Sequence, residues 1–178
     1  MASTQPRGLR NNNPGNLRIT SIPWVGKLSK AENTDGAFEQ FRSLKWGLRA
    51  MILDVRSKIS KGLDTIEKLL SVYAPKLEND TANYARIVAQ RSGLKTGQRL
   101  TATKEVLSRL VLAMIRVENG ITLSQADFES GWGVLRATSH DAAAPSPGKA
   151  MACSGSASLP GQATLSTNII PADEAALA

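Results

Sequence analysis

Glu118 is the residue whose type and position best suit acid–base chemistry, and it lies in the sequence AMIRVENG. The residues at helical spacing before it are all apolar: Leu107, Leu110, Val111, Met114 and Ile115. An apolar surface and the negative end of a helix dipole both disfavour the ionised form of a carboxyl group, which favours its use as a general acid. The alternative is a structural glutamate that pairs with an arginine, or one that points to solvent at a frayed helix end.

The histidine and cysteine content excludes several other chemistries. The sequence has one histidine, His140, and one cysteine, Cys153, which excludes an internal disulfide and a His-rich zinc site. A Cys/His peptidase would have to use these two residues, and both lie in a low-complexity segment. We therefore expect no metal and no cofactor.

Helical patterns dominate the part of the chain that positions Glu118. Apolar periodicity and capping signals predict helices over residues 44–60, 64–73 and 103–118, and a short helix from about residue 124. A further helix with Asn79 or Asp80 as its cap ends before Gly93. Aromatic residues and turn signals within residues 24–41 predict a β-hairpin. The predicted fold class is mainly α, with a small β component (α+β).

Composition divides the chain into a body, residues 1–136, and a tail, residues 137–178. The tail is rich in Ala, Ser, Pro and Gly and lacks amphipathic periodicity, so we expect it to be disordered. Of the 22 basic and 15 acidic residues, only Lys149 and three acids lie in the tail, which leaves the body with a formal charge of about +9. Such a charge favours polyanionic partners: nucleic acid, anionic lipid or the bacterial envelope.

Several motifs of the body occur together in one group of proteins. The segments RGLRNNNPGNLR, WVG, FEQFRSLKWGLRAM, YAPKLENDTANYARIVA and MIRVENG, in this order, resemble a family of phage and prophage proteins. Members are described as cell-wall lytic enzymes or as virion structural proteins, and their folds are related to lysozyme. The resemblance extends from Arg7 to about Gly120. It implies cleavage of the peptidoglycan glycan chain, by a muramidase or a lytic transglycosylase, with Glu118 as the general acid.

A second resemblance, to glucosaminidases of the flagellar muramidase type, implies which residues bind the sugar. Those enzymes have a catalytic Glu at a helix end, an Asn-Asn-x-x-Gly turn, a hairpin and a Tyr-Ala segment, and here the helix that carries the Glu comes last. The resemblance therefore implies a circularly permuted lysozyme-like domain. It also implies saccharide contacts from the following side chains, each of which has a structural alternative: Asn12, Asn13, Asn16, Trp24, Tyr73 and Tyr84.

Other acids compete for catalytic roles. Glu32 and Asp35, and also Glu39, lie in the predicted hairpin, where each could activate water in a hydrolase or be a solvated loop acid. A lytic transglycosylase is favoured if no second carboxylate is within reach. Glu129, in the sequence ESGWG, resembles the local catalytic motif of the glucosaminidases and is our second choice for the acid.

The expected partner is bacterial peptidoglycan, with other virion proteins as a second class that the tail would contact. The start of the chain has no apolar signal core, and no window approaches the ~20 apolar residues of a membrane span. We expect synthesis in the host cytoplasm and action at the cell wall or in the virion. The main rival is a noncatalytic virion structural or wall-binding protein. A nucleic-acid-binding helix-turn-helix is disfavoured because its second helix lacks a basic or amide row.

Overall fold

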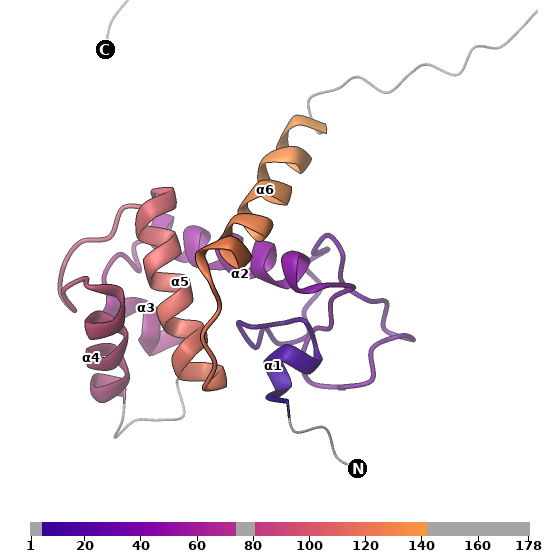
Figure 1. The fold of residues 1–178 in the computed structure, drawn as a ribbon, viewed down its shortest axis with the longest axis horizontal. Helices are drawn as coiled ribbons and strands as arrows, with labels where there is room; N and C mark the ends of the chain where they lie inside the picture. Colours follow the sequence, from indigo (N-terminus) through magenta and orange to yellow (C-terminus); the bar gives the residue numbers. More distant parts are fainter. Residues whose placement is uncertain (1–4, 74–80, 142–178) are drawn as a thin grey trace, which may run out of the picture. The chain divides into compact units, whose positions relative to one another are not determined.

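The computed structural model describes residues 5–73 and 81–141, with side chains up to residue 136. These residues form six helices, and Figure 1 shows how the helices are arranged. Their bounds are α1 Arg7–Arg10, α2 Leu44–Ser60, α3 Ile66–Tyr73, α4 Thr81–Ser92, α5 Lys104–Asn119 and α6 Gln125–Asp141. The prediction of a mainly α fold is confirmed. Its lysozyme-like character and its permuted order stay predictions.

The core forms where the apolar faces of the long helices meet. Helix α2 packs against α5 and α6, and α4 packs against both α3 and α5. The two central helices contribute most of the fully buried side chains: Leu48, Met51, Ile52 and Val55 from α2, and Leu107, Leu110, Val111, Met114 and Ile115 from α5. Each such side chain contributes roughly 1.5–3 kcal/mol through burial. The predicted apolar stripe that leads to Glu118 is therefore buried, and it defines the face of α5 that points into the core.

Helix α5 has clear signals at both ends. The Thr103 side chain accepts a hydrogen bond from the Val106 amide, which caps the start. Gly120 follows the helix with φ +68°, a left-handed conformation that glycine adopts without steric cost. Because both ends are defined, Glu118 lies in the last turn, as the sequence predicted.

The asparagine-rich turn, residues 11–16, packs directly on the helices. A Cβ atom on Gly47 of α2 would lie 1.8 Å from the Asn12 carbonyl oxygen, so only glycine permits this approach. From α5, the buried Asn119 donates a hydrogen bond to the Pro14 carbonyl oxygen (2.8 Å). Asn12 and Asn16 have φ values of +49° and +45°, a region that asparagine tolerates better than most residues. The turn thus connects the start of the chain to α2 and to the end of α5.

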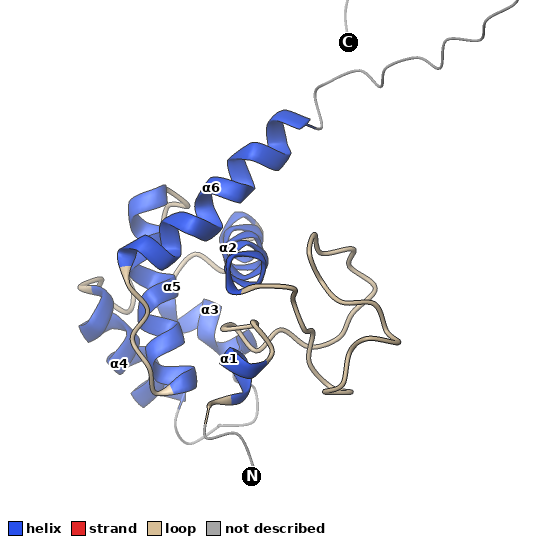
Figure 2. Ribbon diagram, turned by 45° about the vertical axis from the view of Figure 1, so that its right-hand side comes forward, coloured by secondary structure: helices blue, strands red, loops and turns tan. Residues whose placement is uncertain are grey.

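The predicted β-hairpin is wrong in detail. Figure 2 shows the segment between α1 and α2 as loop throughout, and within the described residues it forms only isolated antiparallel bridges, Arg18 with Phe38 and Lys27 with Phe41. Side chains take the backbone hydrogen bonds that a ladder would use: Asn33 donates to the Phe38 carbonyl oxygen (2.9 Å), and Asp35 accepts from the Phe38 amide (3.1 Å). Polar residues that bond to nearby backbone favour turns over a regular ladder.

Two other boundaries differ from the predictions. The helix expected to be short, α6, has 17 residues and continues to Asp141, past the proposed limit of the body at residue 136. Helix α3 begins after Thr65, whose hydroxyl oxygen accepts from the Lys68 amide (3.2 Å). The proposed caps Asn79 and Asp80, and the tail from residue 142, lie outside the described residues. Among the residues that are described, no helix is both long and apolar enough to cross a membrane.

Candidate functional site

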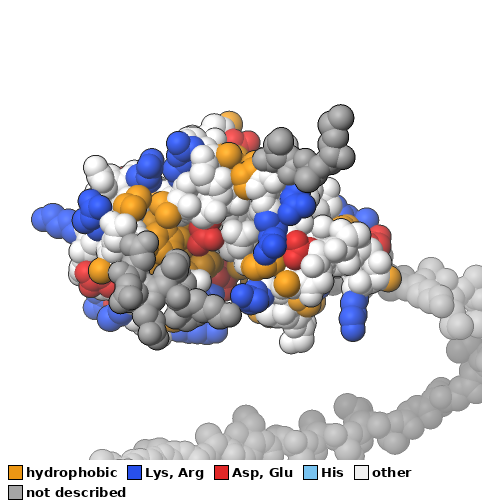
Figure 3. All heavy atoms as spheres, turned by 90° about the horizontal axis from the view of Figure 1, so that it is seen from below, with side chains coloured by type: hydrophobic (Ala, Val, Ile, Leu, Met, Phe, Trp, Pro, Cys, Tyr) orange, Lys and Arg blue, Asp and Glu red, His pale blue; other side chains and the backbone are white. Residues whose placement is uncertain are grey.

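A pocket of about 610 Å³ lies where the asparagine-rich turn and the loop 17–43 meet α1, α2, α3 and the end of α5. Figure 3 views the molecule from below Figure 1, and it shows acidic, basic and hydrophobic side chains next to one another in the middle of this face. The lining residues that matter below are Arg7, Asn16, Arg18, Trp24, Phe38, Asp54, Lys58, Tyr73 and Glu118. A concave surface with a few polar groups among apolar ones is typical of a ligand site.

Glu118 lines this pocket and is half-buried. One carboxylate oxygen accepts a hydrogen bond from the Tyr84 hydroxyl (2.8 Å), and the other accepts from the Asn16 amide (3.1 Å). Asn16 belongs to the opening turn and Tyr84 to α4, so the carboxyl group is held by two elements that are distant in sequence. Glu118, Asn16 and Tyr84, three of the residues predicted for one site, therefore meet.

Tyr84 contacts Glu118 through its hydroxyl group and is otherwise almost fully buried. Its side chain is 7% exposed, so it is not a stacking platform for sugars. Burial raises the pKa of the Tyr84 phenol, and the adjacent Glu118 carboxylate raises it further. The phenol therefore stays protonated and keeps donating its hydrogen bond throughout the neutral range.

A second carboxylate of the pocket comes from Asp54 on α2, which the sequence reasoning missed. It accepts hydrogen bonds from the Tyr73 hydroxyl and from Lys58, one helical turn later. The Lys58 ammonium also lies 4.9 Å from the centre of the Tyr73 ring. Burial is the main cause that raises the pKa of Tyr73, followed by the nearby Asp54, while the Glu118 carboxylate adds a smaller effect. Tyr73 contacts Asp54 directly, and it lines the same pocket as Glu118.

The signal for Asp54 was present in the sequence but was weak. Asp54 and Lys58 are four residues apart on the predicted helix 44–60, at the edge of its apolar face. Such a pair usually stabilises a solvent-exposed helix surface. Only the packing of α3 against this surface turns it into a pocket wall.

Of the predicted saccharide-binding asparagines, Asn16 alone lines the pocket. Asn13 is fully buried, and its side chain bonds only to backbone: it accepts from the Leu17 amide and donates to the carbonyl oxygens of Leu17 and Glu39. Asn12 donates to the Phe41 carbonyl oxygen (3.0 Å). The geometry favours the structural alternative for these two residues.

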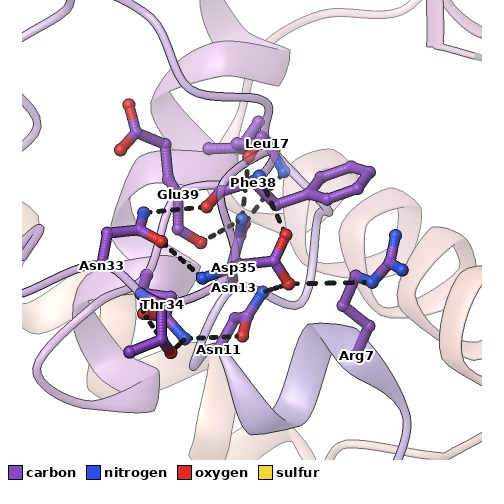
Figure 4. A network of polar contacts seen from close by, with 10 residues as sticks. Arg7, Asn11, Asn13, Leu17, Asn33, Thr34, Asp35, Phe38 and Glu39 are labelled. Atoms are coloured by element: carbon purple, nitrogen blue, oxygen red, sulfur yellow. Dashed lines mark hydrogen bonds and ion pairs between the residues drawn. The ribbon is translucent and has the colours of Figure 1, made fainter. Parts of the chain in front are cut away.

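Figure 4 shows the polar contacts between the turn and the loop 17–43, which join protein groups to one another. Asn11 donates to Asp35 (2.8 Å) and accepts from Gln40 (3.0 Å), so it joins the start of the chain to the loop 17–43. Arg7 lies beside the same Asp35 carboxylate, with 3.7 Å between the charged atoms. The asparagine-rich turn is therefore mainly a frame that presents Asn16 and its neighbours to the pocket.

The predicted aromatic contacts divide in the same way. Trp24 and Tyr73 line the pocket and are half-buried, so each can present part of a ring to a ligand. Phe41, another aromatic residue of the loop 17–43, is 2% exposed and belongs to the buried core.

The acids proposed as second carboxylates lie elsewhere. The pKa of Asp35 is lowered mainly by the Asn11 hydrogen bond, and that of Glu32 by the Ser29 amide, to which it bonds at 2.9 Å. Glu39 is buried and accepts from Lys27 and from the Thr20 amide, both at 3.1 Å. None of these three carboxylates is among the lining residues.

Glu129, the second choice for the general acid, lies outside the pocket. On α6 it forms an ion pair with Lys104 (2.7 Å) and accepts a hydrogen bond from Gln125 (3.1 Å). Lys104 is the main cause that lowers the pKa of Glu129, which is opposite to what a general acid needs. Its side chain is 41% exposed, as expected for a surface ion pair.

No cluster of three potential metal ligands occurs within the described residues, so those residues offer no metal site of that kind. The polar groups of the side chains that line the pocket are carboxylates, cations, one phenol, one amide, one hydroxyl and an indole N–H. These groups can transfer protons, donate hydrogen bonds to a ligand and stabilise charge.

Comparison with known proteins identifies a phage relative. No protein-family model matches the chain. Protein P5 of Pseudoalteromonas phage PM2 is 38% identical to this chain over 118 residues, which correspond to 64% of this chain and 71% of the relative. This comparison supports the predicted relation to phages.

Proposed function

This chain belongs to the protein family that includes protein P5 of Pseudoalteromonas phage PM2, and for this phage-type protein we propose cleavage of the β-1,4 glycan chain of peptidoglycan. Glu118 is the general acid of this reaction and Asp54 is the second carboxylate. The observation that supports the proposal is the arrangement of two carboxylates in one pocket, each accepting a hydrogen bond from a protonated tyrosine.

The proposed reaction begins with proton transfer from Glu118 to the oxygen that leaves with one sugar. The bond then breaks through an oxocarbenium-like transition state. Tyr84 and Asn16 hold the carboxyl group in place, so that little reorganisation is needed at the moment of transfer. Asp54 supplies negative charge to the developing cation or accepts a proton from water. Trp24 offers a ring face to a sugar.

The test is incubation of purified peptidoglycan with wild-type protein and with Glu118→Gln, followed by mass spectrometry of the soluble fragments. Wild type should release muropeptides, and the variant should be at least about 100-fold slower, because general acid catalysis contributes 10²–10⁴-fold. Glu129→Gln is the matched control and should retain activity. Reducing product ends indicate a muramidase, whereas anhydro ends indicate a lytic transglycosylase. Equal rates for Glu118→Gln and wild type would disprove the role of Glu118.

Asp54→Asn tests the second carboxylate. The substitution keeps an acceptor for the Tyr73 hydroxyl but removes the charge beside Lys58. We expect folded protein with a large loss of hydrolytic rate. Unchanged activity would leave Glu118 acting alone, as a lytic transglycosylase requires.

The second candidate function is a noncatalytic component of the phage particle that binds the wall or other virion proteins. The name of the relative specifies a phage and no activity, so the comparison supports this alternative better than it supports catalysis. Release of no fragments by wild type, together with detection of the chain in purified particles by mass spectrometry, would establish it. Either role is compatible with synthesis in the host cytoplasm and later contact with the envelope.

A further inference from the structure

One side of the pocket carries two arginines that contact the same aromatic ring. Arg7 of α1 and Arg18, just after the asparagine-rich turn, both line the pocket together with Phe38. Their guanidinium carbons lie 5.0 Å and 5.2 Å from the centre of the Phe38 ring. The face of an aromatic ring attracts cations, so this ring offsets part of the repulsion between the two groups and restricts their positions.

The positive charge of this pair is only partly compensated. Asp35 lies 3.7 Å from Arg7, but its two oxygens already accept hydrogen bonds from Asn11 and from the Phe38 amide. Arg18 is exposed and forms no ion pair with an acidic residue in residues 5–73 or 81–136. Of the two guanidinium groups, only that of Arg7 therefore lies beside a carboxylate, and most of their N–H donors remain available to a ligand.

We propose that Arg7 and Arg18 bind a carboxylate of the ligand, so that the pocket selects anionic peptidoglycan over a neutral glycan. This inference rests on the proposed function for the identity of the ligand. The planar guanidinium fork matches a carboxylate and binds it through two parallel hydrogen bonds. The pocket also contains the acidic side chains of Glu118 and Asp54, and Lys58 pairs only with Asp54, so a suitable ligand is neutral next to Glu118 and anionic next to the arginines.

Glu118 in its ionised form disfavours a nucleic acid as the ligand, since no ion pair of the described residues compensates its charge, whereas Lys58 compensates that of Asp54. A polyphosphate carries closely spaced charges along its length and would bring some of them near Glu118 and Asp54. A glycan strand carries its carboxylates at intervals, separated by neutral sugar rings. The pocket charges therefore favour the glycan.

The carboxylates of peptidoglycan have two sources, and they can be separated. In the intact wall the lactyl group of muramic acid is joined to the peptide by an amide bond, so the free carboxylates are those of the stem peptides. Removal of the peptides by an amidase exposes lactyl carboxylates instead. Amidation of intact sacculi with a carbodiimide and ammonia neutralises the stem carboxylates without cutting the glycan.

The experiment measures co-sedimentation of the full chain with purified sacculi, in a Glu118→Gln background that prevents cleavage during the assay. Arg18→Gln should weaken binding about ten-fold, in line with the loss of one charge-assisted contact. Arg10→Gln is the matched control, because it removes the same charge from an exposed side chain that does not line the pocket. Arg18→Lys should give a smaller loss. Circular dichroism confirms that each variant is folded.

The arms of the assay distinguish the possible results. If the stem carboxylates are the ligand, the Glu118→Gln protein should bind amidated sacculi weakly, and adding Arg18→Gln should not weaken this binding further. An effect of Arg18→Gln that appears only on peptide-free strands assigns the lactyl carboxylate. Equal binding by Arg18→Gln and Arg10→Gln overturns the inference, even if wild type cleaves the wall. If binding depends on the carboxylates but the wild-type protein releases no fragments in the cleavage assay, the inference is supported and the enzymatic proposal is refuted. Absence of binding to any sacculi, or Arg18-dependent binding to duplex DNA alone, refutes both the inference and a wall-binding role.

Discussion

Asn13→Ala tests whether the asparagine-rich turn is a structural frame or a sugar-binding surface. Asn13 is fully buried, and its side chain makes three hydrogen bonds: to the Leu17 amide (3.0 Å), the Leu17 carbonyl oxygen (2.9 Å) and the Glu39 carbonyl oxygen (2.8 Å). The alanine cannot replace any of them. The substitution therefore leaves buried backbone groups without partners at the place where the turn meets the loop 17–43.

The magnitude follows from these three bonds. A typical intramolecular hydrogen bond contributes about 1 kcal/mol, and an unsatisfied buried group costs about as much or more. We expect the free energy of unfolding to fall by about 3 kcal/mol. For a domain of this size a change of 1 kcal/mol shifts the melting temperature by roughly 3–4 °C, so the expected decrease is about 10 °C.

The assay is thermal unfolding followed by circular dichroism, with Asn16→Gly as the comparison. Asn16 bonds to Glu118 in the pocket, and glycine retains its φ of +45° without strain. Asn16→Gly should change activity or binding on peptidoglycan with little change in melting temperature. Asn13→Ala should lower the melting temperature but leave activity and binding unchanged when they are assayed well below that temperature. A stable Asn13→Ala protein with weakened peptidoglycan binding would refute the structural role of Asn13.

Three further outcomes are expected. In chemical denaturation, Gly47→Ala should destabilise the protein by about 1–3 kcal/mol despite the better helix propensity of alanine, because its Cβ would lie 1.8 Å from a carbonyl oxygen of the turn. Gly133→Ala, where the added Cβ has open space around it, is the control and should be neutral or stabilising. The chain has two tyrosines, Tyr73 and Tyr84, and both have a raised pKa, so tyrosinate absorbance should stay low in the native protein above pH ~10 and appear only with unfolding. Because the folded pKa values exceed the unfolded ones, stability is complete below pH ~10 and decreases as pH rises above it, and titration of either phenol in folded protein near pH 10 would contradict this. Glu129→Gln should leave both the melting temperature and any hydrolytic rate nearly unchanged, since its carboxylate forms an exposed ion pair, and a large loss of rate would reopen its candidacy as the acid.

The helix positions, and the place of Glu118 in the last turn of α5, were predictable because they depend on local patterns. The apolar spacing from Leu107 to Ile115 and the glycine at position 120 define both the buried face and the end of α5. The loop 17–43 was predicted less well, because its turn signals do not reveal whether backbone or side chains will take the hydrogen bonds. Here side-chain amides form some of these bonds, for example that of Asn33, which donates to the Phe38 carbonyl oxygen.

The sequence by itself determined that the chain is mainly helical, and its resemblances made Glu118, three asparagines of the turn and three aromatic residues candidates for one site. Only the tertiary structure decided which polar residues face the pocket. It buried Asn13, placed Glu129 in a surface ion pair and brought Asp54 beside Tyr73. The physical reason is that local periodicity specifies which face of an element is apolar, whereas the partners of a polar side chain depend on contacts between segments far apart in the chain.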